Sequence, residues 1–202
     1  MSRVVVLGAA GRTGRLIVEE AARAGHQVTA AVRTPSNLSH EVRADVRDPA
    51  SLRDAIRGHD VVVSAIGPPG RRSNGLYSAG ARATIEAMRA AGVTRLLTIS
   101  SVGVRPDDPN FSWWYRYLVR PIAKDLYADM RRMEDIVRAT DLDWTFVRPT
   151  YLQDRPATGA YRVGDNEMPP GGLRITRADL AGFIVEELDQ HRWSRRAPSL
   201  AE

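Results

Sequence analysis

Three glycines near the start of the sequence have the spacing of a phosphate-binding loop. Gly8-Ala9-Ala10-Gly11-Arg12-Thr13-Gly14 comes directly after the apolar run Val4–Leu7. There the first glycine permits a tight turn, the second lets the backbone approach a pyrophosphate, and the third lets the next helix pack closely. The amino end of that helix offers unpaired N–H groups and the positive end of its dipole to an anion. We therefore expect this loop to bind a pyrophosphate.

The end of the second expected strand indicates which dinucleotide would bind. A site for NAD usually carries an acidic residue there, which binds the ribose hydroxyls. This sequence instead has Arg33-Thr34, and Arg12 lies within the glycine loop. Two guanidinium groups suit a 2′-phosphate, so we expect NADP(H) rather than NAD(H). The alternative is an ordinary surface arginine, because Lys124 is the only lysine among 29 basic residues.

Short apolar runs alternate with helical patterns along the chain. The expected strands are Val4–Leu7, Val28–Val32, Val42–Val46, Val61–Ile66, Leu96–Ile99 and Trp144–Val147. The expected helices are Arg12–Arg23, Asp48–Ile56, Leu76–Ala91, Leu126–Thr140 and a capped helix that begins at Thr176. Such alternation predicts an α/β protein with a three-layer, Rossmann-type, doubly wound parallel sheet in a single domain. We expect residues 1–189 to form this NAD(P)-binding domain, with a small C-terminal substrate region, and residues 190–202 to be a flexible tail.

Composition excludes several other classes of protein. The 202 residues fit one domain, and the absence of cysteine removes disulfide scaffolds, thiol nucleophiles and cysteine-ligated metals. The four histidines are scattered without a ligand spacing, so no metal site is expected. No basic block suggests nucleic-acid binding, and no apolar run is long enough to span a membrane. We therefore expect a cytoplasmic protein that acts on a small molecule, as a monomer or a dimer.

The catalytic pair of ordinary short-chain reductases is missing from the sequence. Those enzymes use Tyr-x-x-x-Lys, in which the lysine helps the tyrosine to give up its proton. Here the residue four positions before Lys124 is Arg120. This absence argues against a standard carbonyl or alcohol dehydrogenase.

Longer segments resemble a known family over nearly the whole chain. They include VVVLGAAGRTG, VTAAVRTPSNL, ADVRDPASL, VVVSAIG, GARATIEAMRAAGVTRLLTISSVGV, LDWTFVRP and QDRPATGAYRV. The chain resembles the atypical short-chain dehydrogenase/reductases with NAD(P)-binding NmrA-like domains. Within them it is most similar to the flavin reductase (NADPH) or biliverdin reductase B branch.

This resemblance implies that the pyrophosphate binds the loop residues Gly8, Ala10, Gly11, Arg12, Thr13 and Gly14 and that the 2′-phosphate binds Arg33. It also implies site residues at the ends of other strands. It assigns the adenine to Asp45 and Val46, and the ribose and nicotinamide side to Ala65, Ile66 and Gly67. It places the hydroxyls of Ser100 and Ser101 beside the nicotinamide. The carboxamide and the substrate would lie against Pro149, Thr150, Tyr151 and Leu152. Ser101 and Tyr151 are the candidate catalytic residues.

The resemblance also implies an activity, with two alternatives. It favours an oxidoreductase that transfers hydride from NADPH to a flavin, quinone or similar planar, conjugated molecule, which takes its proton from solvent. The alternatives are a redox sensor that binds NADP(H) without turnover, and a tailoring reductase or isomerase of a biosynthetic pathway. The aromatic segment Phe111–Tyr117 departs from this branch. It would serve as a lid, a dimer contact or a membrane-surface contact.

Overall fold

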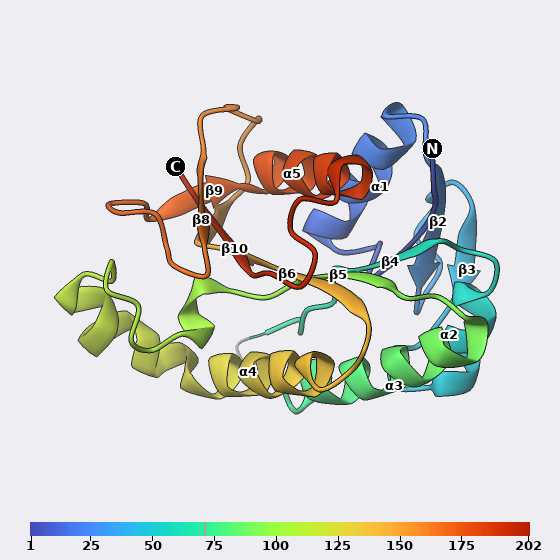
Figure 1. The fold of residues 1–202 in the computed structure, drawn as a ribbon, viewed down its shortest axis with the longest axis horizontal. Coiled ribbons are helices and arrows are strands. Elements are labelled where there is room, and N and C mark those ends of the chain that lie inside the picture. Colours follow the sequence, from blue (N-terminus) through green and yellow to red (C-terminus); the bar gives the residue numbers. More distant parts are fainter. Residues whose placement is uncertain (71) are drawn as a thin grey trace.

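The computed structural model describes residues 1–70 and 72–202 and shows a sheet covered by helices on both faces (Figure 1). The helices are α1 (Arg12–Arg23), α2 (Pro49–Ile56), α3 (Leu76–Ala91), α4 (Lys124–Arg138) and α5 (Arg177–Gln190). The strands of the main sheet are β1 (Arg3–Leu7), β2 (Gln27–Val32), β3 (Glu41–Arg43), β4 (Val61–Ser64), β5 (Arg95–Ile99), β6 (Asp143–Pro149), β8 (Arg162–Asp165) and β10 (Pro198–Ala201). A separate parallel pair consists of β7 (Tyr151–Gln153) and β9 (Arg174–Thr176).

The eight-stranded sheet has the order β3-β2-β1-β4-β5-β6-β10-β8. All its neighbouring strands pair in parallel except β8, which runs antiparallel to β10. The chain therefore winds outward in both directions from β1, which lies between β2 and β4. Ligands of such sheets bind at the carboxyl ends of the strands where the winding direction changes. The expected α/β, doubly wound, single-domain fold is confirmed.

Alternating side chains of the central strands build two cores. Val4 and Val6 of β1 pack on one face among residues of α1 and α5, whereas Val5 and Leu7 pack on the other face among residues of α2, α3 and α4. Figure 1 shows the corresponding layers, with α1 and α5 on one side of the sheet and α2, α3 and α4 on the other. Burial on both faces explains why β1 and β4 read as continuous apolar runs in the sequence.

The C-terminal segment is ordered, so the prediction of a flexible tail was wrong for its end. Pro198–Ala201 forms β10, is buried along its length, and pairs in parallel with β6 and antiparallel with β8. Its short proline- and serine-containing sequence gives no strand signal of its own. Strands distant in the sequence hold β10 in place, because its backbone hydrogen-bonds to β6 on one side and to β8 on the other.

Residues 113–123 form an extension that the sequence did not predict to be helical. Trp113 begins it, a π-helical turn spans Tyr115–Val119, a 3₁₀ turn spans Arg120–Ala123, and α4 follows directly. In Figure 1 this segment extends beyond the sheet at one end of the molecule. Among the described residues, no helix has the length and apolar composition needed to cross a membrane.

Candidate functional site

The glycine loop between β1 and α1 makes a close contact with the end of β4. Gly8 has φ +77°, and a Cβ at this position would lie 2.8 Å from the carbonyl oxygen of Ala65. A Cβ on Gly14 would lie 2.3 Å from the carbonyl oxygen of Gly8. Both glycines are therefore required by the protein's own packing. Gly11 differs, because its φ is −71° and the nearest atom to an added Cβ is the Gly8 oxygen at 3.2 Å.

The first turn of α1 leaves backbone donors without partners. Its N-cap residue Gly11 provides no side-chain cap, and no acidic residue occupies the first turn. With the described residues, the N–H groups of Arg12, Thr13 and Gly14 form no hydrogen bond. These donors lie at the positive end of a 12-residue helix, beside the uncovered backbone of Gly11. The loop therefore fits a pyrophosphate, which would accept hydrogen bonds from this turn.

Arg12 is held on one side of this loop by an ion pair. Its guanidinium lies 2.6 Å from Asp154, and the other carboxylate oxygen of Asp154 lies 2.7 Å from Arg177 on α5. Asp154 therefore links the glycine loop to α5. Because Arg12 is engaged in this way, the expected clamp of Arg12 and Arg33 is not preformed.

The end of β2 exposes Arg33, which forms no hydrogen bond or ion pair with any described residue. The hydrogen-bond donors that follow Arg33 in the chain are engaged by Glu41. The carboxylate of Glu41 accepts hydrogen bonds from the backbone and hydroxyl of Ser36 and from the N–H of Leu38. The Ser36 hydroxyl, followed by these backbone donors, keeps the pKa of Glu41 below its usual value. Arg33 is therefore positioned at this strand end to bind an anion from solvent.

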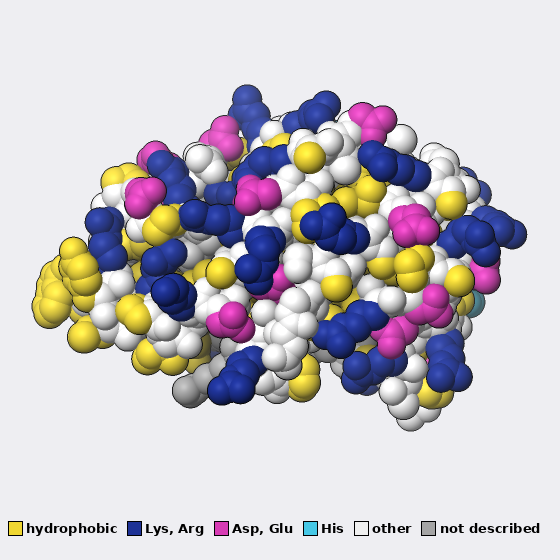
Figure 2. All heavy atoms as spheres, turned by 90° about the horizontal axis from the view of Figure 1, so that it is seen from below, with side chains coloured by type: hydrophobic (Ala, Val, Ile, Leu, Met, Phe, Trp, Pro, Cys, Tyr) yellow, Lys and Arg dark blue, Asp and Glu magenta, His cyan; other side chains and the backbone are white. Residues whose placement is uncertain are grey.

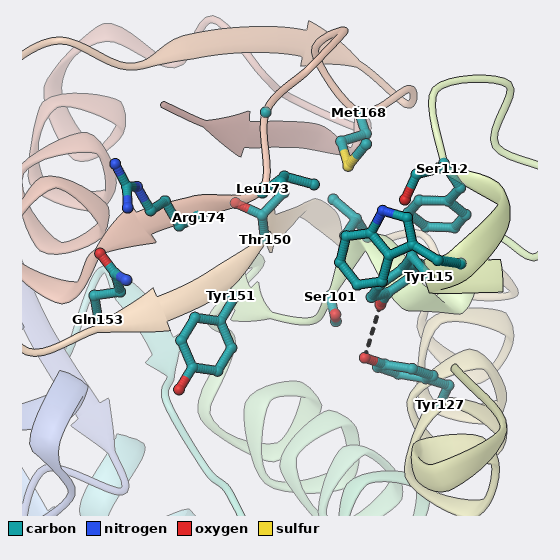
Figure 3. Close-up of a pocket in the computed structure, with 14 residues that line it drawn as sticks. Ser101, Ser112, Tyr115, Tyr127, Thr150, Tyr151, Gln153, Met168, Leu173 and Arg174 are labelled. Atoms are coloured by element: carbon teal, nitrogen blue, oxygen red, sulfur yellow. Dashed lines mark hydrogen bonds between the residues drawn. The ribbon is translucent and has the colours of Figure 1, made fainter. Parts of the chain in front are cut away.

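A cavity of about 390 Å³ opens beyond β5 and β6 (Figure 3). Most of its wall is aromatic or apolar. The lining residues are Ser101, Val102, Phe111, Ser112, Trp114, Tyr115, Tyr127, Thr150, Tyr151, Gln153, Met168, Gly172, Leu173 and Arg174. Tyr151 and Gln153 also line a shallower hollow that contains Arg12. The glycine loop and the cavity thus meet along β7.

Two phenols face each other in the cavity wall. The hydroxyls of Tyr115 and Tyr127 lie 3.0 Å apart, and Figure 3 shows Ser101 close to the pair. The ring of Tyr127 lies against Gly103, where an added Cβ would come within 2.3–2.6 Å of ring atoms. Burial, together with the neighbouring Tyr127, raises the pKa of Tyr115 above its ordinary value. Tyr115 therefore stays protonated at neutral pH and can donate a hydrogen bond.

Residues 8–191 match the family model described as NAD(P)H-binding. The chain belongs to this family. The chain is also similar to a curated protein of about the same length. The uncharacterized protein YwnB of Bacillus subtilis is 29% identical, over 93% of this chain and 92% of its own.

Solved structures agree with the family and differ in the activities that their names carry. A candidate NADH-flavin reductase from Streptococcus pneumoniae is 26% identical, with a TM-score of 0.81 and full coverage of both chains. A candidate NAD-dependent epimerase/dehydratase from Bacillus halodurans is 28% identical, with a TM-score of 0.83, and the match covers 100% of this chain and 94% of the other. A candidate exported protein from Burkholderia pseudomallei is 32% identical, with a TM-score of 0.84 over both whole chains. The cytoplasmic location therefore stays a prediction.

Within this NAD(P)H-binding fold, the two serines after β5 have different positions. Ser101 lines the cavity, and its hydroxyl accepts a hydrogen bond from the N–H of Gly103. Ser100 is buried and donates to Glu134 at 2.7 Å, and Glu134 in turn pairs with Arg148. The Ser100 hydroxyl is thus part of an interior network. Its place beside the nicotinamide stays a prediction, and in this structure the hydroxyl is engaged by Glu134.

The other expected residues lie at the carboxyl edge of the sheet. Ala65, Ile66 and Gly67 follow β4, beside the glycine loop. Thr150 borders the cavity, but its hydroxyl and N–H both donate to the carbonyl of Leu200. Tyr151 is 72% exposed at the junction of cavity and hollow. The remaining expected residues are Asp45 and Val46, which follow β3, Pro149, which ends β6, and Leu152 on β7.

Gln153, Met168 and Leu173 were missed at the sequence level, and so was the contact between Tyr115 and Tyr127. Gln153 begins the segment QDRPATG, and its buried side-chain oxygen has no hydrogen-bond partner among the described residues. Met168 and Leu173 come from the loop before β9, which carries no motif. Tyr115 and Tyr127 are separated by eleven residues in the sequence, and only the turn at 115–123 brings their hydroxyls together. Across the described residues, no cluster of His, Asp or Glu side chains fits a metal ion.

Proposed function

We propose that the protein is an NADPH-dependent oxidoreductase that reduces a flavin, quinone or similar conjugated molecule without a Tyr-Lys pair. One observation carries this proposal. The donor-rich glycine loop and a largely apolar cavity with several aromatic side chains meet at Tyr151 and Gln153, on the edge of the sheet where such folds bind ligands. A dinucleotide bound to the loop would supply a hydride at this junction.

The preference for NADPH rests on charge at the end of β2. Arg33 is exposed and forms no hydrogen bond or ion pair with the residues that the structure describes, and none of the residues from Arg33 to His40 is acidic. A 2′-phosphate would gain a charge-assisted hydrogen bond there, whereas the hydroxyl of NADH would gain less. The pyrophosphate would bind the N–H groups of Arg12, Thr13 and Gly14, and Arg12 would add a cation after leaving Asp154.

The cavity's own residues are suited to bind and orient a planar acceptor. Phe111, Trp114 and Tyr115 offer aromatic surface for stacking. Ser101 and the Tyr115–Tyr127 pair provide hydroxyls for a polar atom of the acceptor, and Tyr151 flanks the entrance. The side-chain oxygen of Gln153, which has no hydrogen-bond partner in the described part of the chain, would accept from an amide N–H at the junction. The protein thus contributes orientation and hydrogen bonds, while solvent supplies the proton.

The direct test combines binding and turnover. Thermal unfolding would be followed with NADPH and with NADH, and the loss of NADPH absorbance would then be recorded with flavins, quinones and saturated carbonyl compounds. The proposal predicts a larger stabilisation by NADPH than by NADH. It also predicts turnover with at least one conjugated acceptor and none with the saturated carbonyls. Binding of NADPH without any turnover would reject the enzyme and leave the redox sensor.

The likeness to a candidate NAD-dependent epimerase/dehydratase supports a second candidate, a redox-neutral isomerase. Such an enzyme would return the hydride to its product and consume no nicotinamide over a complete cycle. The two candidates differ in stoichiometry. One equivalent of NADPH oxidised for each product supports the reductase, and product formed with a catalytic amount of cofactor supports the isomerase.

A further inference from the structure

Large apolar side chains on the extension before α4 face solvent. Trp113 is 71% exposed, Tyr117 70%, Leu118 62% and Ile122 67%. Residues four positions apart lie on the same side of a helical segment, which places Trp113 near Tyr117 and Leu118 near Ile122. We call these four exposed side chains the apolar tip. Trp114, by contrast, lines the cavity.

The apolar tip lies on a projection of the molecule. Figure 1 shows the segment extending past the sheet, and Figure 2 shows hydrophobic side chains gathered at the same end of the molecule. An exposed apolar patch of this kind marks a surface that contacts another phase or another molecule.

A row of positive charge accompanies the apolar tip. Arg116, Arg120 and Lys124 are spaced four residues apart, and the segment from Phe111 to Lys124 contains no Asp or Glu. Arg116 and Arg120 donate to the backbone carbonyls of Asp108 and Gly103. Those partners are neutral. Among the described residues, no carboxylate forms an ion pair with any of the three cations.

Charge distinguishes among the partners that would cover this surface. A second copy of the chain, related by a twofold axis, would bring the same row of cations to the interface, where like charges repel. An anionic lipid surface supplies both missing partners, since its acyl boundary accepts apolar side chains and its headgroups attract Lys and Arg. Trp and Tyr are also the aromatic residues that favour the membrane–water boundary.

We propose that residues 113–124 dock the protein reversibly on an anionic lipid bilayer. The apolar tip enters the boundary between headgroups and acyl chains, and the exposed Lys124 faces the lipid phosphates, while Arg116 and Arg120 add positive charge to the same segment. This inference is independent of the proposed activity. It has a consequence for that activity, because Trp114 and Tyr115 of the same segment line the cavity. Docking would bring the cavity close to lipophilic molecules dissolved in the membrane.

Vesicle co-sedimentation tests the docking. Vesicles of phosphatidylcholine alone would be compared with vesicles of equal parts phosphatidylcholine and phosphatidylglycerol, at low and high salt. We expect binding to the anionic vesicles that weakens as salt is added. The triple variant Trp113→Ser, Leu118→Ser and Ile122→Ser should weaken it at least about tenfold, because three exposed apolar groups are removed. Val163→Ser, a partly exposed strand residue outside the segment, should bind as the unaltered protein does.

A variant with one charge removed tests the proposal even if the triple variant does not fold. Lys124→Gln removes an exposed cation and should weaken binding about fivefold, whereas Arg43→Gln on β3 should leave it unchanged. Circular dichroism and the thermal midpoint would show that each variant is folded. The proposal is overturned if the protein does not bind anionic vesicles, or if the folded triple variant binds them equally well. It is also overturned if sedimentation velocity reveals a dimer that the triple variant abolishes, since the tip is then a self-interface.

Discussion

At the residue scale, Gly11 is the glycine of the loop whose side-chain position is open. Gly8 and Gly14 are fixed by contacts within the protein, so their replacement would disturb the fold. Gly11 has an ordinary negative φ and one near neighbour, which makes it suited to a test of ligand binding.

We predict that Gly11→Trp abolishes nicotinamide binding while the protein stays folded. The indole would fill the space in front of the free N–H groups of α1. Calorimetric titration should show the affinity for NADPH falling by more than about a hundredfold, equivalent to about 3 kcal/mol. Ala22→Trp adds the same bulk at an exposed position near the other end of α1 and should bind normally. Unchanged binding by Gly11→Trp would show that the dinucleotide lies elsewhere.

Arg33→Asp tests the choice of nicotinamide. Loss of a charged hydrogen bond and the added repulsion should weaken NADPH by about 1–3 kcal/mol, with a much smaller effect on NADH. Arg43→Asp, an exposed change on the neighbouring strand, should leave the ratio of the two affinities unaltered. Equal losses for NADPH and NADH in the Arg33 variant would reject the assignment of NADP(H).

Tyr127→Phe tests the phenol pair. The phenyl ring retains its contact with Gly103, but the Tyr115 hydroxyl loses its partner. If the pair binds a polar atom of the acceptor, kcat/KM for the acceptor should fall at least about tenfold, with the Kd for NADPH unchanged. Tyr161→Phe, outside the cavity, is the matched control. Equal acceptor kinetics in both variants would exclude the pair from the site.

Residue-level reasoning succeeded where a local pattern carries the chemistry. The glycine loop needs only a strand, a turn and a helix in succession, and the structure has all three at the expected positions. It did not foresee the hydrogen bond from the Ser100 hydroxyl to Glu134, which comes from α4 and is itself paired with Arg148 of β6. It also missed Gln153, Met168 and Leu173, whose roles depend on how loops fold over the sheet.

At the element scale, Asp179 joins the start of α5 to the loop before β8. Its carboxylate accepts hydrogen bonds from the N–H groups of Thr158 and Gly159 and from the hydroxyls of Thr158 and Thr176. Thr176 caps the helix by accepting from the N–H of Asp179. Burial raises the pKa of Asp179, but these hydrogen bonds outweigh it, so the pKa lies below its usual value.

We predict that Asp179→Ala lowers the free energy of unfolding by about 2–4 kcal/mol at neutral pH, because several donors lose their acceptor. A carboxyl with a lowered folded-state pKa adds stability that is complete above its unfolded value of about 3.9. That stability is lost as pH falls through the folded-state pKa. Urea unfolding at a series of pH values should therefore show the variant approaching the unaltered protein in acid. Glu186→Ala, an exposed change on the same helix, should show neither effect, and a pH-independent difference for Asp179→Ala would contradict the account.

Elements with their own signals were predicted closely, whereas those held by distant partners were not. Helices α1 and α3 have the expected bounds, because each has a strong periodic pattern and a glycine after its end. The third strand was expected over Val42–Val46 but ends at Arg43. The strand β10 and the helical turns at 115–123 carry no local signal that distinguishes them from loop. Their conformations depend on sheet pairing and on contacts with the cavity wall.

At the scale of the whole molecule, the fold places two unlike surfaces next to each other. The winding of the sheet from β1 outward puts the donors of α1 at one point of its carboxyl edge. The segment between β5 and α4, together with the loop before β9, lines an apolar and aromatic cavity farther along the same edge. An enzyme of the proposed kind needs both surfaces within the span of one dinucleotide.

A crystal structure of the protein with NADPH bound tests this arrangement most directly. The account predicts the pyrophosphate on the N–H groups of Arg12, Thr13 and Gly14, and the 2′-phosphate beside Arg33. It also predicts the nicotinamide ring at Tyr151 and Gln153, with one face turned to the cavity. A dinucleotide bound away from α1, or a nicotinamide ring directed to solvent with the cavity beyond its reach, would contradict it.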